Sequence, residues 1–162
     1  MLFSGAAQSG NIELMNWALD NGEITEDNAN DICYKITSCQ NYDLLKWMLQ
    51  KKGFRWYPGA SKPIIHHGDF KMLKWLWENK YELDKAICKI AAKLGHSEIM
   101  FWAIEKGFPL DDSVLAYAVN REDTKLIQWM LDNGCTWSKA ESLIIKSGSR
   151  ELKSWLIQKL GE

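Results

Sequence analysis

A tryptophan that recurs at nearly constant spacing constrains this sequence more than any other feature. Six residues define the series: Trp17, Trp47, Trp75, Trp102, Trp129 and Trp155. Successive members are separated by 30, 28, 27, 27 and 26 residues. A fixed period in this range is typical of a solenoid built from one repeated unit. We therefore interpret the 162 residues as a single domain of six units, at approximately 1–30, 31–58, 59–85, 86–112, 113–138 and 139–162.

The residues around each tryptophan follow the pattern of an amphipathic helix. The positions three before, one after and two after the tryptophan are apolar in every unit, whereas the position three after it is polar or acidic. Eleven residues before the tryptophan, another apolar column indicates an earlier helix: Ala6, Ile36, Ile64, Ala91, Ala118 and Ile144. Each unit is thus predicted to be a helix, a turn and a second helix. We expect the tryptophans of the series to lie in the core, since rings at this spacing among aliphatic residues usually pack inside.

The predicted turn between the two helices carries a glycine in four units: Gly10, Gly68, Gly95 and Gly148. Glycine suits the left-handed conformation with which many helices end. Gln40 and Glu122 replace it in the second and fifth units. There we expect the next residue, Asn41 or Asp123, to adopt the left-handed conformation, because asparagine and aspartate tolerate it better than most residues.

Two segments resemble the ankyrin-repeat family. The segment Ala91 to Ile99, AAKLGHSEI, resembles the ankyrin core AAxxGHxExxxxLLxxG, and Asn133 to Trp137, NGCTW, is similar to the NGCxW loop of divergent ankyrin repeats common in giant viruses and amoebae. The resemblance implies an all-α stack of six helix-turn-helix units. The TPLH start of the usual ankyrin helix is absent, and the units are shorter than the usual period of about 33 residues. We infer short loops between units in place of the ankyrin β-hairpin finger.

Composition and charge exclude several classes of partner. The chain has 20 basic and 21 acidic residues, so no general attraction to nucleic acid or to a membrane surface is expected. Four cysteines lie in different units without a C-x-x-C pair, and the sequence has neither a signal peptide nor a long apolar run. We therefore expect reduced thiols in an intracellular, cytoplasmic protein, in the host cytoplasm if the source is a virus.

No motif in the sequence indicates chemistry. His66 and His67 are adjacent, so on a helix their side chains point about 100° apart and do not chelate one metal together. His96 follows a glycine as in ankyrin repeats, where the resemblance implies a ring bonded to the backbone. Serine-nucleophile and phosphate-binding signatures are absent, and paired acids such as Asp111 and Asp112 suit helix caps better than acid–base catalysis. We expect no catalytic, cofactor-binding or metal-binding residue and no enzymatic activity.

Three aromatic residues outside the series lie in the predicted loops: Trp56, Tyr57 and Trp137. Trp56 and Trp137 occupy matching positions, together with Leu83 and Leu110, which favours packing between units. The alternative is that they are exposed anchors for a partner. Trp77 replaces an aliphatic residue of the repeat, and we expect it to be in the core.

The resemblance implies that a ligand binds on the concave face, at the loops and at the end of each first helix just before the turn. Those helix-end positions are Gln8 and Ser9, Ser38 and Cys39, His66 and His67, Lys93 and Leu94, Asn120 and Arg121, and Lys146 and Ser147. From them we select His66, His67, Lys93, Asn120 and Arg121, with Trp56, Tyr57 and Trp137 from the loops. Because the central residues are cationic, the predicted partner is a protein with an acidic surface.

Other functional hypotheses remain at this point. The chain could be an architectural or self-associating segment of a larger protein, with a monomer as the first expectation and end-to-end association as the alternative. The polar residues Lys153, Ser154, Gln158 and Lys159 predict a solvated cap on the last helix. A ubiquitin-ligase adaptor would need an F-box-like segment, which the sequence lacks.

Overall fold

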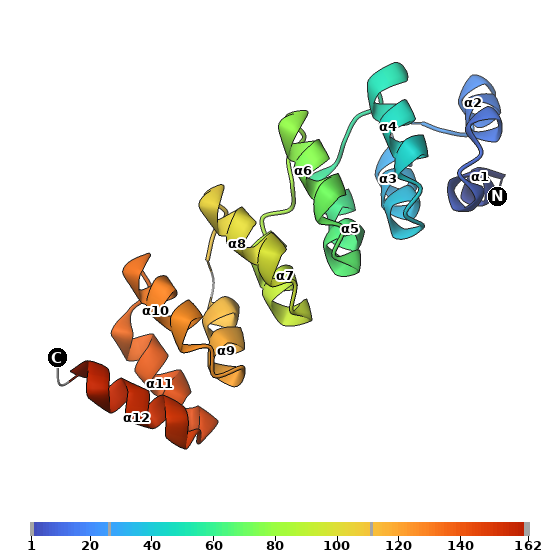
Figure 1. The fold of residues 1–162 in the computed structure, drawn as a ribbon. Coiled ribbons are helices and arrows are strands. Elements are labelled where there is room, and N and C mark those ends of the chain that lie inside the picture. The colour runs from blue at the N-terminus through green and yellow to red at the C-terminus, as the bar shows by residue number, and fades with distance from the viewer. Residues whose placement is uncertain (1, 26, 111, 161–162) are drawn as a thin grey trace.

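The computed structural model describes residues 2–25, 27–110 and 112–160, and over these the chain is all-helical (Figure 1). The α-helices in chain order are α1 Leu2–Ser9, α2 Ile12–Asp20, α3 Ala29–Ser38, α4 Tyr42–Lys51, α5 Lys62–His67, α6 Phe70–Glu78, α7 Ile87–Leu94, α8 Ser97–Glu105, α9 Asp112–Asn120, α10 Thr124–Asp132, α11 Trp137–Ser147 and α12 Arg150–Leu160. A short 3₁₀ helix, η1 Pro58–Ser61, precedes α5. No strand occurs in these ranges, so the segments joining one helix pair to the next form no β-hairpin there.

The helices form pairs, and the pairs follow one another in a row. Each odd-numbered helix packs on the next even-numbered one, and neighbouring pairs meet chiefly through their first helices, α1 on α3, α3 on α5, and so on to α11. Figure 1 shows α2, α4, α6, α8 and α10 along one edge of the row and α1, α3, α5, α7 and α9 along the other. Because the first helices approach each other most closely, any curvature of the row places them on its inner side.

One hydrophobic core runs along the whole row. The column eleven residues before the tryptophan is fully buried in every unit, at 0% exposure, as predicted. The position directly after the tryptophan is also buried throughout, at 6% exposure or less. Several of the first-helix core residues are alanines, such as Ala6, Ala91 and Ala118, and their small side chains permit the close approach of neighbouring first helices.

The tryptophan series itself is not in the core, and that prediction was wrong. Trp17 is 46% exposed, and the other five residues of the series are half-buried. The pairs meet chiefly through their first helices, and between the second helices aromatic rings make contacts near the surface. Trp102, for example, contacts Phe70 edge to face with ring centroids 5.6 Å apart. The position two residues before the tryptophan, which the amphipathic pattern did not single out, is instead fully buried in the first five units: Met15, Leu45, Leu73, Met100 and Ile127.

The turns within the pairs share one geometry whether or not they contain glycine. Gly68 has a φ of +72°, and Gln40 and Glu122 have φ values of +60° and +56°. The prediction that Asn41 and Asp123 adopt the left-handed conformation was therefore wrong. The residue after the left-handed one donates its N–H five residues back, as Asp69 does to the Ile64 carbonyl at 3.1 Å. This Schellman geometry requires the left-handed residue in one position, and a neighbour cannot supply it.

The residue that follows the turn has two different roles. In four units its side chain accepts a hydrogen bond from the N–H three residues later and caps the second helix of its own pair: Asn11, Asp69, Asp123 and Ser149. In the other two it reaches back to the preceding pair. Asn41 donates to the Ala7 and Gln8 carbonyls, and His96 Nε2 donates to the His66 carbonyl at 3.2 Å. The predicted backbone bond of His96 is thus present, and it joins two pairs.

Candidate functional site

The two positions before the left-handed residue of each turn form a column along the ends of the first helices, which we call the helix-end column. Of these twelve residues ten are exposed, and the remaining two, Ser38 and Cys39, are half-buried. The central members lie on α5, α7 and α9, which contact one another in sequence. The structure therefore brings His66, His67 and Lys93 into one surface with Asn120, the last residue of α9, and Arg121, which directly follows it.

This surface is held firmly by the backbone beneath it. The His66 carbonyl accepts the bond from the ring of His96, so the end of α5 is tied to the following pair. The Arg121 guanidinium lies over the Tyr117 ring, 5.5 Å from its centroid, a position that restrains a long side chain. Leu94, 41% exposed, adds an apolar side chain between Lys93 and the turn. The surface thus combines cationic, polar and apolar groups on short helices with fixed ends.

The three loop aromatics lie elsewhere. Trp56 and Tyr57 precede η1 and α5, whereas His66 and His67 end α5, so the two groups occupy opposite ends of the same helix. The Trp56 indole N–H donates to the Glu82 carbonyl at 2.6 Å, which links two pairs as the packing interpretation expects. Trp137 is 39% exposed and begins α11, where it stacks on Trp155 with centroids 6.3 Å apart. These residues and the helix-end column do not form one site.

Sites for metal or nucleophilic chemistry do not emerge in the part of the chain that the structure describes. No three histidine, cysteine or acidic side chains in that part gather closely enough to hold a metal ion. Burial raises the pKa of the Cys33 thiol to about 12, so it stays protonated near neutral pH and is a poor nucleophile. None of the described helices has the length and apolar character needed to cross a membrane.

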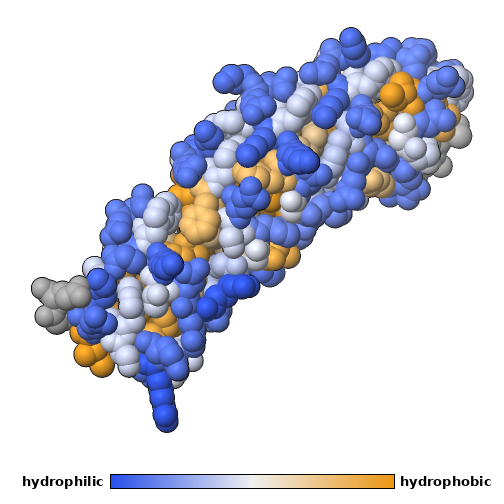
Figure 2. Space-filling model, viewed as in Figure 1, coloured by the Kyte–Doolittle hydropathy of each residue, from blue (hydrophilic) through white to orange (hydrophobic). Residues whose placement is uncertain are grey.

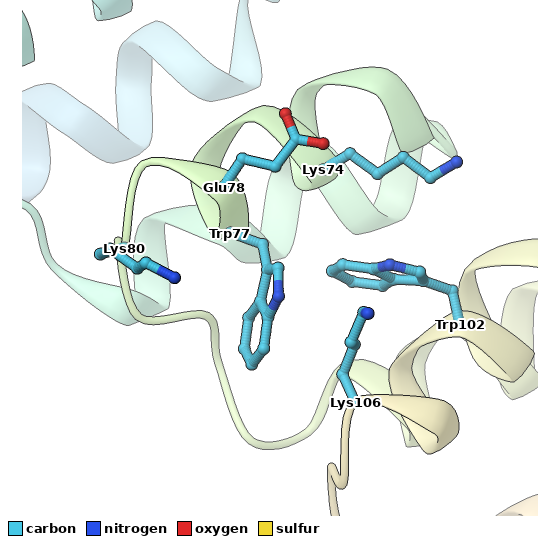
Figure 3. A pocket seen from close by; sticks show the side chains of 6 residues that line it. All are labelled: Lys74, Trp77, Glu78, Lys80, Trp102 and Lys106. Atoms are coloured by element: carbon cyan, nitrogen blue, oxygen red, sulfur yellow. The ribbon is translucent and has the colours of Figure 1, made fainter.

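A hollow between two second helices is a further candidate that sequence reasoning missed. It lies between the end of α6 and α8, has a volume of about 440 Å³, and is lined by two tryptophans, three lysines and one glutamate: Lys74, Trp77, Glu78, Lys80, Trp102 and Lys106 (Figure 3). Trp77, expected in the core, is only half-buried here. Two departures from the repeat could have indicated this place, namely Trp77 in an aliphatic column and Lys80 in a column of glycines.

Figure 2 shows that hydrophilic side chains cover most of one face of the row and that apolar side chains gather along its middle. Both candidate surfaces, the helix-end column and the hollow, thus belong to a molecule with a mixed exterior. Comparison with other proteins adds no assignment: the chain matches no protein-family model, no curated protein and no solved structure.

Proposed function

We propose that this chain is a non-catalytic protein–protein interaction module that binds a protein partner at the ends of its first helices. The contrast between two nearby columns carries the proposal. The column eleven residues before the tryptophan is buried and made of alanine and isoleucine only. The column before the turn is exposed and differs from unit to unit. Core positions repeat because the packing repeats, whereas a surface that recognises one partner has no reason to repeat.

The proposed scaffold is an ankyrin-like solenoid. Helix pairs that meet through their first helices support it, as does the bond from His96 to the preceding pair. In such a scaffold each pair depends on its neighbours for stability, and the exposed helix ends are free to vary. Since no strand lies between the described pairs, recognition falls to the helix ends rather than to projecting hairpins.

The chemistry of the central column favours an acidic partner. Lys93 lies on α7 and Arg121 directly follows α9, and both side chains are exposed. An acidic surface placed across them gains charge complementarity, which sets the rate of association and the specificity more than the affinity. Leu94, exposed next to Lys93 at the end of α7, supplies an apolar contact whose burial adds affinity.

Affinity capture from a lysate of the source cells, read by mass spectrometry, tests this function. The test variant replaces four residues of the column by alanine: His66, His67, Lys93 and Arg121. A matched control variant replaces two lysines and two glutamines on exposed parts of other helices: Gln50, Lys51, Lys125 and Gln158. We expect a protein that the wild type and the control variant retain and the test variant loses. Identical captures by all three proteins would contradict binding at the column.

The alternative, a self-associating or architectural segment, has one observation in its favour. Ile145 is 55% exposed on α11, whereas Val119 and Ala92, in the same position of preceding units, are 2% and 1% exposed beneath the next pair. Ile157 on α12 is 71% exposed, so an apolar side chain lies at the surface beside the polar residues predicted to form a solvated cap. Light scattering at high protein concentration distinguishes the alternatives. A dimer or longer assembly that Ile145→Glu dissociates would favour association, and a strict monomer would exclude it.

A further inference from the structure

The hollow between α6 and α8 has a rigid aromatic floor. The rings of Trp77 and Trp102 meet edge to face at 82°, with centroids 5.9 Å apart. Each ring also contacts a phenylalanine: the Phe108 centroid lies 5.5 Å from that of Trp77, and the Phe70 centroid lies 5.6 Å from that of Trp102. Both tryptophans are half-buried, so part of each indole packs against the protein while the remainder lines the hollow. Such a surface offers apolar contact with little loss of side-chain freedom on binding.

The rim of the hollow is positively charged. Three lysines and one glutamate line it, which gives a local net charge of +2 in a chain whose net charge is −1. Figure 3 shows Lys106 reaching toward the space between the two indoles, Lys80 on the other side of Trp77, and the Glu78 carboxylate turned away from the rings. Among the described residues, no acidic side chain lies within ion-pair distance of Lys74, Lys80 or Lys106; the ion pair found there joins Lys62 and Asp84. The positive charges at the hollow are therefore not neutralised by a direct partner there.

Two departures from the repeat coincide at this hollow. The position two after the tryptophan is aliphatic in the other five units, whereas here it is Trp77. The left-handed residue after the second helix is glycine in four other units, namely Gly22, Gly53, Gly107 and Gly134, whereas here it is Lys80 with a φ of +65°. A lysine in this conformation is strained. In exchange for this strain, the lysine places an ammonium group at the rim of the hollow, which a glycine cannot do.

We propose that the hollow binds an acidic peptide segment of a protein partner, with one aromatic or aliphatic side chain of that segment on the two indoles. Carboxylates on either side of that side chain would pair with Lys80 and Lys106. A nucleic-acid strand fits less well. In the two hollows that adjoin this one, Glu82 and Glu98 lie among the lysines, so a phosphate backbone meets repulsion as soon as it leaves the central hollow.

This site is separate from the helix-end column of the proposed function. The column lies at the turn before α6, whereas Trp77 and Lys80 of the hollow lie at or just after the far end of α6, about 12 Å further along a helix of this length at 1.5 Å per residue. Lys74 lies between them, since it lines both this hollow and the adjoining one that His67 lines. The two sites can therefore be tested independently. Either one can fail without the other.

Titration of ¹⁵N-labelled protein, followed through its indole N–H signals, tests the proposal. The probe is a pool of acetylated and amidated nonapeptides with Trp, Phe or Leu at the centre and Asp or Glu elsewhere, and Trp77→Phe and Trp102→Phe assign the two signals. We expect saturable shifts of both signals that weaken as salt is added. The triple variant Lys74→Gln, Lys80→Gln, Lys106→Gln should bind about tenfold more weakly, because the two charge pairs of Lys80 and Lys106 and the nearby charge of Lys74 are lost.

Matched controls decide the outcome. The variant Lys51→Gln, Lys52→Gln, Lys125→Gln removes the same charge from other exposed positions, and the alanine variant of the helix-end column tests independence. Both should bind the pool as the wild type does. The proposal is overturned if the indole signals of Trp77 and Trp102 do not shift, or if the two lysine variants bind the acidic pool equally well. It is also overturned if a pool with Asn and Gln in place of the acids binds as well as the acidic pool, or if a single-stranded decathymidylate binds more tightly than that pool.

Discussion

Two turns at equivalent positions of the repeat differ in how the following helix pair packs on them. They are the turn between α5 and α6 and the turn between α3 and α4. Gly68 faces the ring of His96, and a Cβ added to Gly68 would lie 2.8 Å from the ring carbon Cε1. Gln40 precedes a pair whose Asp69 turns inward and accepts from the Met72 N–H at 3.0 Å. The first turn therefore requires glycine for space as well as for conformation, and the second tolerates a side chain.

The other turns follow the same division. Gly10 faces Asn41, which reaches back, and an added Cβ would lie 3.0 Å from its side-chain oxygen. Glu122 precedes Ser149, which caps its own helix. Both non-glycine turns thus precede a self-capped helix. The comparison teaches that the residue allowed in a turn is decided by the neighbouring pair, about 30 residues away in a repeat of this period.

The largest expected effect is at Gly68. Gly68→Ala should destabilise the protein by about 2–3 kcal/mol, because it strains a left-handed residue and displaces the hydrogen bond of His96. Gly95→Ala should cost only about 1 kcal/mol, since the strain is similar but the nearest atom to an added Cβ is 3.7 Å away. Urea unfolding measures both. Equal losses would contradict the role given to the His96 ring.

Asn41 and Asn11 occupy equivalent positions, but the side chain of Asn41 donates hydrogen bonds whereas that of Asn11 accepts one, and the same substitution at both positions tests this difference. Asn41→Asp should cost about 2 kcal/mol, because a carboxylate cannot donate to the carbonyls of Ala7 and Gln8. Asn11→Asp should change stability by less than about 0.5 kcal/mol, because its side chain only accepts and a negative charge suits a helix N-terminus. Thermal or urea unfolding of the two variants, which make the same chemical change, decides between these roles. A similar change in both would contradict the donor role given to Asn41.

A double-mutant cycle can convert one kind of turn into the other. Asp69→His should cost about 1–2 kcal/mol, because it removes a helix cap and Gln40 blocks the ring from reaching the preceding pair. Adding Gln40→Gly opens that space. The gain from Gln40→Gly should then exceed its gain in the wild type by about 1 kcal/mol, the value of one new hydrogen bond. Additive effects in urea unfolding would show that the two positions do not interact.

The smallest expected effect is relief of strain at the tolerant turns. Gln40→Gly and Glu122→Gly should each leave stability unchanged or raise it by up to about 1 kcal/mol, as a left-handed residue is relaxed while the unfolded chain gains freedom. The midpoint of urea unfolding measures this gain. A clear loss at both sites would show that these side chains make contacts that offset their strain.

Much of the helical framework could be predicted because packing repeats. Ala91 and its equivalents lie in a fully buried column, as their apolar identity indicated. The burial of the tryptophans could not be predicted in the same way. Periodicity identifies the apolar face of a helix, but it does not show which residues of that face are covered by the next pair and which remain near the surface. Trp102 and Trp77 are among those near the surface. The candidate column at the helix ends was located from the sequence, whereas the hollow depends on side chains that come from two different units.

The sequence by itself determined the number of helix pairs, the apolar columns that join them and the positions of the turns, because these follow from local periodicity. Only the tertiary structure decided which turn must be glycine, which asparagine donates rather than accepts, and where lysines meet indoles. Those outcomes depend on distances between successive pairs. An asparagine such as Asn11 or Asn41 can either accept a hydrogen bond as a helix cap or donate one to the preceding pair, and the position of that pair decides between the two roles.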